Sequence, residues 1–393
     1  MGLAAVLAGI ALLVSFDLDI SPHRYLRNDV LFRGASSIEA IHSYPTMDPS
    51  PFSIALPADL FVRESLRNGE LPLWDRMQGG GYPVVAQGNL GVMFPLRWLT
   101  APLPPHQAQS AFLLLTLYLC FAGALLWLLE LGSSGVAAAF GAGLYAFSGL
   151  MLCQLLFDGV AVFLFLPWLL LAYHRWERRR SYGRFAALAI AFALSFTSGH
   201  HMLLASVFLG VALVAGLDFI LARRDWRSLA GLGAASVWGA LATSFVLLPF
   251  WLHLRGAWKY KTESALGQSY EVPDLPGWIH DVSSTVLDGH PPVLDTPDFY
   301  QYLGIPAVAL ALLGGFVAHR KRGLRFLPPA LALSFLLCLP GPWMGFLAEL
   351  PPLSFIQMIY LYVIFVGVVA AAAATGFDWL RLRSASRAVS YTH

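Results

Sequence analysis

Long runs of apolar residues, separated by polar stretches, dominate the hydrophobic pattern of this 393-residue chain. A run of about 20 apolar residues is long enough to cross a lipid bilayer as a helix. By this criterion the chain is expected to be an all-α, polytopic integral membrane protein that forms a single domain over residues 1–393. The ten predicted spans lie near residues 2–16, 108–130, 134–152, 158–173, 185–198, 202–221, 229–253, 302–318, 326–340 and 355–377.

Two polar segments between these spans, residues 17–107 and 254–301, are much longer than the rest. Lys and Arg are enriched in the cytoplasmic loops of membrane proteins, so their distribution predicts the orientation. The two long loops hold ten basic residues together with sixteen acidic ones. The other fifteen basic residues fall in alternate short loops and the tail, at 174–184, 222–227, 319–325 and 378–393; the short loop at 130–135 on the same side holds none. The amino terminus is therefore predicted inside the cell and both long loops outside.

Composition agrees with a membrane protein, because 57% of the residues are hydrophobic, 12% are charged and the mean hydropathy is +0.64. The net charge of +2 does not suggest a nucleic-acid partner, since the charges are separated by loop and form no basic face. Cys120, Cys153 and Cys338 all fall inside apolar segments. We therefore expect neither a disulfide framework nor a metal site built from cysteine.

The stretch from residue 57 to 95, in the first long loop, is rich in glycine, proline and aromatic residues. We expect a short helix at about 58–67, because the glycine and proline of GELPLWD stop helices. Trp74 has an amphipathic ring suited to the membrane–water boundary, and the glycines before Tyr82 permit a sharp turn or a close approach to a ligand. Two interpretations follow: a rigid platform that binds a substrate with Trp74 and Tyr82, or an ordered loop that caps helix ends.

Polar side chains that the predicted fold does not need gather at the outer ends of the spans. They include Gln154, Asp158, Gln357 and the turn at 198–201, besides the two long loops. A transporter would more often place ionisable groups at mid-membrane with access to both faces. Because the predicted spans are almost free of such groups, the pattern predicts an active or binding site at the outer leaflet.

Two segments of the first long loop, LRNGELPLWD and GGGYPVVAQGNLGVMFPL, resemble the first extracytoplasmic loop of YfhO-like bacterial membrane proteins. These proteins belong to the GT-C superfamily of integral-membrane glycosyltransferases. The resemblance continues in LYAFSG, SGHH, YQYLGIPAVALALLG and LPPLSFIQMIYLYVIFVGVVAAAAATGFDWL, and so spans nearly the whole chain. The chain departs from its relatives at Gln357, where they commonly carry Arg, and it lacks the Asp-Glu pair of other GT-C branches.

The resemblance implies a GT-C-like glycosyltransferase in the cytoplasmic membrane of a bacterium. Such an enzyme moves a sugar from a polyprenyl-phosphate donor to a glycan, lipid or protein acceptor of the cell envelope, on the extracytoplasmic face. The reaction needs a carboxylate to deprotonate or orient the acceptor hydroxyl, cations or a metal at the leaving phosphate, and an apolar groove for the lipid. The resemblance places the acidic residue in the first loop, which makes Asp48 the expected base and Asp158 the second choice.

Each carboxylate also has a structural interpretation. Asp48 precedes a proline and would suit a type I turn, and Asp158 would suit a solvated loop. In the loop helix, Asp59 is expected to cap the amino terminus, and Glu64 to pair with Arg67 or Arg63 on the surface.

His200 and His201 lie at a helix junction, where imidazoles can bind a phosphate, a sugar hydroxyl or a metal; His200 occupies the Gly-His position of the relatives. The alternative is a pair of interfacial histidines with internal partners. Arg255, Lys259 and Lys261 alternate with aromatic residues just after a span, a pattern suited to an anionic headgroup or to bilayer anchoring.

Gln154 and Gln357 are expected to add polar groups to the same pocket. The segment DGHPPVLDTPD could suggest a metal, but proline-rich turns use the same residues, so no metal ligand is assigned and the cofactor is left open. The main rival function is a non-catalytic membrane protein that binds polyprenyl lipids or supports polysaccharide export. It predicts lipid binding that is insensitive to Asp48→Asn.

Overall fold

The computed structural model describes residues 56–76, 80–154, 159–222, 225–256, 303–338 and 358–390. Every regular element in these ranges is helical, apart from one isolated antiparallel bridge between Asp75 and Tyr82. The predicted all-α class therefore holds for this part of the chain. In order, the elements are α5 (Leu56–Arg67), α6 (Val84–Gln87), α7 (Pro95–Thr100), α8 (Pro105–Glu130), α9 (Gly135–Ala146), α10 (Gly149–Cys153), α11 (Val160–Phe163), α12 (Phe165–Arg178), α13 (Tyr182–Thr197), α14 (His201–Ala222), α15 (Trp226–Ala242), α16 (Ser244–Gly256), α19 (Ile305–Ala318), η5 (Arg322–Leu324), α20 (Leu327–Cys338), η7 (Met358–Leu361) and α22 (Tyr362–Ser390).

Three of these helices are long and apolar enough to cross a membrane, as expected of a membrane protein. The candidate spans are Gln107–Glu130 in α8, His201–Ala222 in α14 and Tyr362–Arg383 in α22. α15 and α16 pass the same test together, which raises the number to four. The shorter apolar helices include α9, α13, α19 and α20. The count of ten spans and the GT-C-like fold stay predictions.

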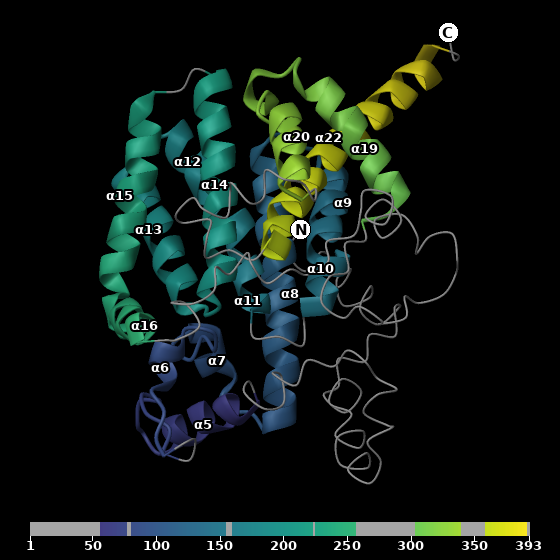
Figure 1. Cartoon of the computed structure of the whole chain (residues 1–393). Helices are drawn as coiled ribbons and strands as arrows, with labels where there is room; N and C mark the ends of the chain where they lie inside the picture. The colour runs from purple at the N-terminus through teal and green to yellow at the C-terminus, as the bar shows by residue number, and fades with distance from the viewer. Residues whose placement is uncertain are drawn as a thin grey trace.

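The predicted span at 229–253 is not one continuous helix, because α15 and α16 meet at an angle of 82°. The break falls at Thr243, whose hydroxyl donates a 2.8 Å hydrogen bond to the carbonyl oxygen of Gly239. Hydroxyl side chains that bond to the preceding turn bend helices. The bend directs α16 toward α6, so the second half of this segment reaches the first long loop (Figure 1).

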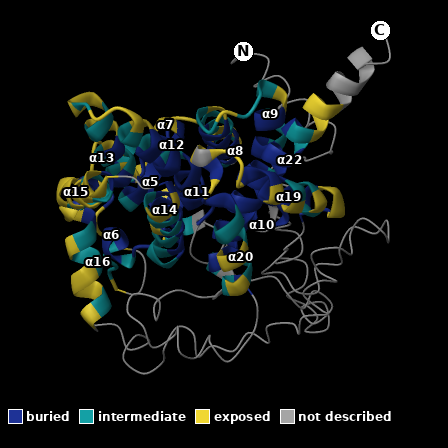
Figure 2. Ribbon diagram, turned by 90° about the horizontal axis from the view of Figure 1, so that it is seen from above, coloured by how far each residue is buried: buried dark blue, intermediate teal, exposed yellow. Residues whose placement is uncertain are grey.

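α22 forms the centre of the bundle and packs against α19, α20, α9 and α14 (Figure 1). Its run of small residues, Ala370–Ala374, is buried, and a Cβ atom at Gly314 of α19 would collide with the backbone of Ala372. Small residues of this kind let helices approach closely where lipid supplies no hydrophobic driving force. In Figure 2, buried residues gather around α8 and α22, while exposed residues lie along α15 and α16.

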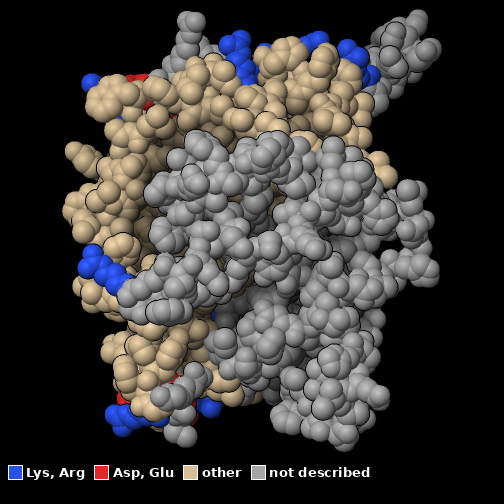
Figure 3. Space-filling view, in the orientation of Figure 1, with Lys and Arg blue, Asp and Glu red and all other residues tan. Residues whose placement is uncertain are grey.

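Charged side chains gather mainly at the two ends of the bundle, with largely uncharged side chains between them on the face that Figure 3 shows. At one end, Arg178 lies 2.9 Å from Glu130, and Arg180 lies 2.8 Å from Asp225. These pairs join loops that the sequence analysis placed on a common side. We call this the arginine end, defined by residues 130–134, 175–184 and 225–228. The opposite end, made of α5, α6 and α7 with the segments they contact, is the loop end (Figure 1).

Candidate functional site

A buried ion network holds the loop end together. The Asp59 carboxylate accepts hydrogen bonds from Arg63 Nε at 2.6 Å and from Arg97 Nη1 at 3.2 Å. All three residues are buried, and Arg63 also donates to the carbonyl oxygen of Thr100 at 3.2 Å. The network therefore ties α5 to α7, a structural role.

The pairs that the structure shows in this helix were not predicted. Asp59 lies in the first turn of α5, and its carboxylate binds two arginine side chains. Arg63 pairs with Asp59, four residues earlier on the buried face of the helix, while Glu64 points to the exposed face. Buried ions must be paired, and this requirement selects the partner on the inner face.

The two ends of the glycine-rich segment meet at Asp75 and Tyr82. The backbones of Asp75 and Tyr82 exchange two hydrogen bonds of 2.8 and 2.7 Å. Gly80 and Gly81 have φ angles of +82° and +121°, which L-residues rarely adopt. The indole of Trp74 lies against Gly81, since a Cβ atom there would be 2.6 Å from Trp74 Nε1. With 53% of Trp74 exposed, its ring is available at the surface.

Tyr82 connects this turn to the last turn of α16. Its ring meets that of His253 edge to face, with 6.4 Å between centroids, and burial raises the pKa of Tyr82. Two residues further on, the Arg255 guanidinium lies 5.3 Å from the centroid of the Trp251 ring. Arg255 is exposed and so remains accessible to an anionic group.

The first long loop meets the turn between α13 and α14 through backbone contacts. We call this contact, between residues 88–91 and 198–201, the loop–turn junction. A Cβ atom at Gly199 would lie 2.5 Å from the Gly91 nitrogen and 2.6 Å from the Asn89 carbonyl oxygen. The same Asn89 oxygen accepts a 3.3 Å hydrogen bond from the backbone N–H of His200. Only glycine allows the two backbones to approach this closely.

The His201 side chain links the two segments of the junction. Its Nδ1–H donates a 2.7 Å hydrogen bond to the carbonyl oxygen of Gly88, and its ring stacks on Phe250 with 4.2 Å between centroids. The cavity beside it, lined by Thr197 and Val246 among others, measures only about 10 Å³. A space of that size holds about one water molecule and excludes any larger ligand.

His200, the other histidine of the turn, pairs with Tyr360. His200 Nδ1 accepts a 3.3 Å hydrogen bond from the Leu203 N–H, which leaves the proton on Nε2, 3.1 Å from the Tyr360 hydroxyl oxygen. Burial, with a further contribution from His201, lowers the pKa of His200 to about 4. The imidazole is therefore neutral at pH 7 and offers hydrogen bonding but no positive charge.

Of the remaining candidates, Gln154 lies within the described residues and five others do not. Gln154 is buried at the end of α10, and after it Gly159 packs against His200, 3.1 Å from a ring carbon to a Cβ atom built at that glycine. Among the described residues, no group of three His, Cys, Asp or Glu could hold a metal ion. Five candidates lie outside the described residues: Asp48, Asp158, Lys259, Lys261 and Gln357.

Sequence reasoning missed Tyr360, Asn89 and Phe250. Tyr360 stands in the apolar run IQMIYLYV, where nothing marks one aromatic residue as polar in function. Asn89 contributes only its backbone, so its side-chain type carries no signal. Gly88 and Gly91, seven and ten residues after Gly81, were a usable sign of close backbone contact.

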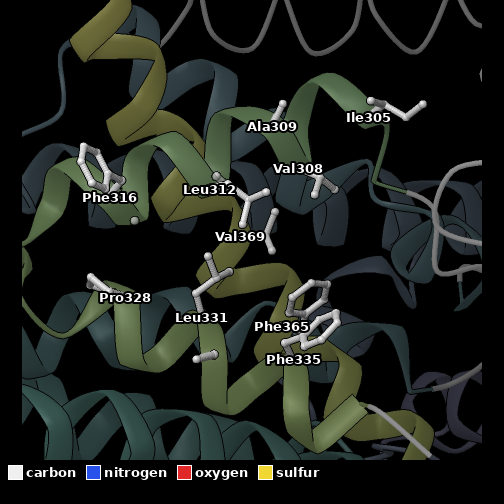
Figure 4. A pocket seen from close by; sticks show the side chains of 13 residues that line it. Ile305, Val308, Ala309, Leu312, Phe316, Pro328, Leu331, Phe335, Phe365 and Val369 are labelled. Carbon is white, nitrogen blue, oxygen red and sulfur yellow. The ribbon is translucent and has the colours of Figure 1, made fainter. Parts of the chain in front are cut away.

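An apolar groove of about 690 Å³ opens among α19, α20 and α22. In Figure 4, Val308 and Leu312 of α19 and Leu331 and Phe335 of α20 line the space, with Phe365 of α22 behind them. Thirteen residues line the groove, and none of them is charged. Such a surface suits a hydrocarbon chain.

Comparison of the chain with protein families, with curated proteins and with solved structures finds no match.

Proposed function

We propose that this chain is a membrane glycosyltransferase that moves a sugar from a polyprenyl-phosphate donor to an acceptor of the bacterial cell envelope. The site lies at the edge of the loop–turn junction, which faces the extracytoplasmic side. Asp48 acts as the base, with Asp158 as the second choice. The groups proposed to bind substrate are His200, His201, Gln154, Gln357, Trp74 and Tyr82, together with Arg255, Lys259 and Lys261 for the donor phosphate.

The observation that carries this proposal is the meeting of three segments far apart in the sequence. Asn89, His200 and Tyr360 belong to three of the stretches that resemble the YfhO-like proteins. His200 joins them, through its backbone to Asn89 at 3.3 Å and through its ring to Tyr360 at 3.1 Å. Tight glycine contacts fix this geometry, and a binding site needs rigid positioning of that kind.

The groove of Figure 4 supports the choice of a lipid-linked donor. Phe365 lines the groove, and Tyr360 contacts His200 only five residues earlier in the chain. At about 2 Å per residue in η7 and about 1.5 Å per residue in α22, Phe365 lies roughly 8 Å along the axis from Tyr360. A prenyl chain in the groove would bring its phosphate and sugar to the His200–Tyr360 pair.

The second candidate is a non-catalytic membrane protein that binds polyprenyl lipids or supports polysaccharide export. The buried carboxylate of Asp59 favours this candidate. It is paired with two arginines inside the loop end, so it is not available as a catalytic base. The two candidates share the groove and differ in whether chemistry follows binding.

The test measures sugar transfer or donor hydrolysis by purified protein in lipid, with a panel of labelled undecaprenyl-phosphate sugars. Asp48→Asn is compared with Glu70→Gln, which removes the same charge at an exposed site of the same loop. General bases contribute roughly 10²–10⁴-fold, so a loss of that size in Asp48→Asn alone supports the enzyme and its base. Activity retained by Asp48→Asn moves the base to Asp158. Tight lipid binding without turnover of any donor supports the second candidate.

A further inference from the structure

A second groove runs along α12 and α13 on the other flank of the bundle, with a volume of about 920 Å³. Its wall at the loop end comes from α7, including Leu96 and Leu99, and its length is lined by apolar residues of α12 and α13. At the arginine end it is lined by Arg175 and Arg184. This groove therefore has an apolar body and a basic mouth.

On the floor of the groove, the indole N–H of Trp168 is already hydrogen-bonded, so a ligand need not supply a partner for it. Trp168 donates its indole N–H to the carbonyl oxygen of Leu119 at 3.0 Å, and its ring packs on Gly123. On the open side, Ile190 is 58% exposed and Leu194 37% exposed. A hydrocarbon chain could therefore enter sideways from the bilayer and cover surface that the protein leaves exposed.

The mouth carries more positive than negative charge. Arg175 lies 3.3 Å from Glu130 and is 47% exposed, but the same carboxylate also binds Arg178. Arg184 donates to the carbonyl oxygen of Arg175 at 2.6 Å and forms an ion pair with no carboxylate of the described residues. Next to it, Gly183 has open space where a side chain would be. A phosphate group would find two guanidinium groups and room to reach them.

The length of the groove fits one leaflet of a membrane. From Arg184 to Leu194, ten residues of α13 rise about 15 Å at 1.5 Å per residue. The hydrocarbon core of a bilayer is about 30 Å thick, so this distance is about half of it. A lipid with its phosphate at the arginines would place its chain along α12 and α13 and end near the bundle centre.

We propose that this groove binds an anionic phospholipid, with its phosphate at Arg175 and Arg184 and one acyl chain between α12 and α13. We choose an anionic lipid because of its charge. A zwitterionic lipid would bring a cationic group to a mouth that is already basic. The site lies at the opposite end from the loop–turn junction and does not depend on the proposed function.

The test is native mass spectrometry of the delipidated full-length protein in detergent, titrated with phosphatidylglycerol or phosphatidylcholine. The protein should retain one phosphatidylglycerol at concentrations where phosphatidylcholine is lost. Each cation near an anionic lipid is worth about a fivefold change in affinity, so Arg175→Gln with Arg184→Gln should weaken retention about thirtyfold. Arg179→Gln is the matched control, because Arg179 is exposed in the same loop but does not line the groove.

A second variant tests the chain and not the headgroup. Ala187 is exposed and lines the groove, so Ala187→Trp should fill it and reduce retention without a change in charge. Arg184→Gln alone serves if the double variant fails to fold, since Arg184 forms no ion pair with the described residues. The proposal is overturned by equal retention of the two lipids, by an effect of Arg179→Gln as large as that of Arg184→Gln, or by unchanged retention in Ala187→Trp.

Discussion

The two ends of the bundle use charge in opposite ways. At the loop end, Asp59, Arg63 and Arg97 have side chains no more than 7% exposed and satisfy one another. At the arginine end, Arg175 and Arg178 are about half exposed, at 47% and 57%, and share Glu130. A buried network fixes geometry because a lost partner leaves an unpaired charge, whereas exposed pairs are screened and replaceable. The side chains of the loop end are therefore held in a more fixed geometry than those of the arginine end.

The largest effect is expected from Asp59→Asn. It removes the carboxylate that buried Arg63 and Arg97 both bind, which should lower the free energy of unfolding by about 3–5 kcal/mol. Denaturant titration in mild detergent measures this loss. The matched variant is Glu130→Gln at the arginine end, where the exposed partners predict a loss of about 0–1 kcal/mol. Similar losses in the two variants would contradict the distinction between the ends.

Alanine substitutions at two glycines distinguish the cost of backbone strain from the cost of close packing. Gly199 and Gly132 have φ angles of +91° and +90°, but a Cβ atom meets the Gly91 backbone at Gly199 and nothing within 4 Å at Gly132. Gly132→Ala should cost about 1–2 kcal/mol for the left-handed backbone alone. Gly199→Ala should cost about 1–3 kcal/mol more from the forced contact, by the same titration. Equal costs would show that the junction is not tightly packed.

Acid should weaken the loop end before the arginine end. Burial lowers the pKa of His200 to about 4, while an unfolded histidine has an ordinary pKa of 6.5. As the pH falls below 6.5 the unfolded state binds the proton first, so stability falls until about pH 4, by about 2 kcal/mol between pH 7.5 and pH 5. His200→Gln should remove this part of the pH dependence, and an identical pH dependence in both proteins would refute it.

The arginine end should not respond in that window. A hydrogen bond from the Arg227 N–H, followed by one from Arg180, lowers the pKa of Asp225 from its ordinary 3.8. A carboxyl group with a lowered pKa contributes its stability above the unfolded pKa and loses it as the pH falls further. Its loss therefore begins only below about pH 4.

The sequence predicts the helical class, the short helix α5 and the turn at Gly80 and Gly81, because apolar periodicity and glycine act locally. It does not predict the 82° bend at Thr243, since one hydroxyl that bonds to the preceding turn leaves no trace in hydropathy. It also does not predict that Arg63 pairs with Asp59, because the choice between Asp59 and Glu64 depends on which face of α5 becomes buried. Such information exists only after packing.

In the candidate site, too, local features were predicted and contacts between distant segments were not. The adjacent histidines indicated a helix junction, which lies between α13 and α14, but the contact of this turn with residues 88–91 was not predicted. The roles of the two histidines were not readable, because they depend on one positive φ: His200 has φ +42°, which turns the two rings toward different partners. Tyr360 could be recognised only once η7 was placed beside that turn.

The most direct test of the central claim is photo-crosslinking with a polyprenyl-phosphate sugar that carries a photoreactive group on the sugar. If the loop–turn junction is the donor site, labelled peptides come from residues 80–104 and 198–203 and from the segment around Tyr360, and excess unlabelled donor abolishes the labelling. Competed labelling at Arg175 and Arg184, or labelling that the unlabelled donor does not compete, would contradict the claim.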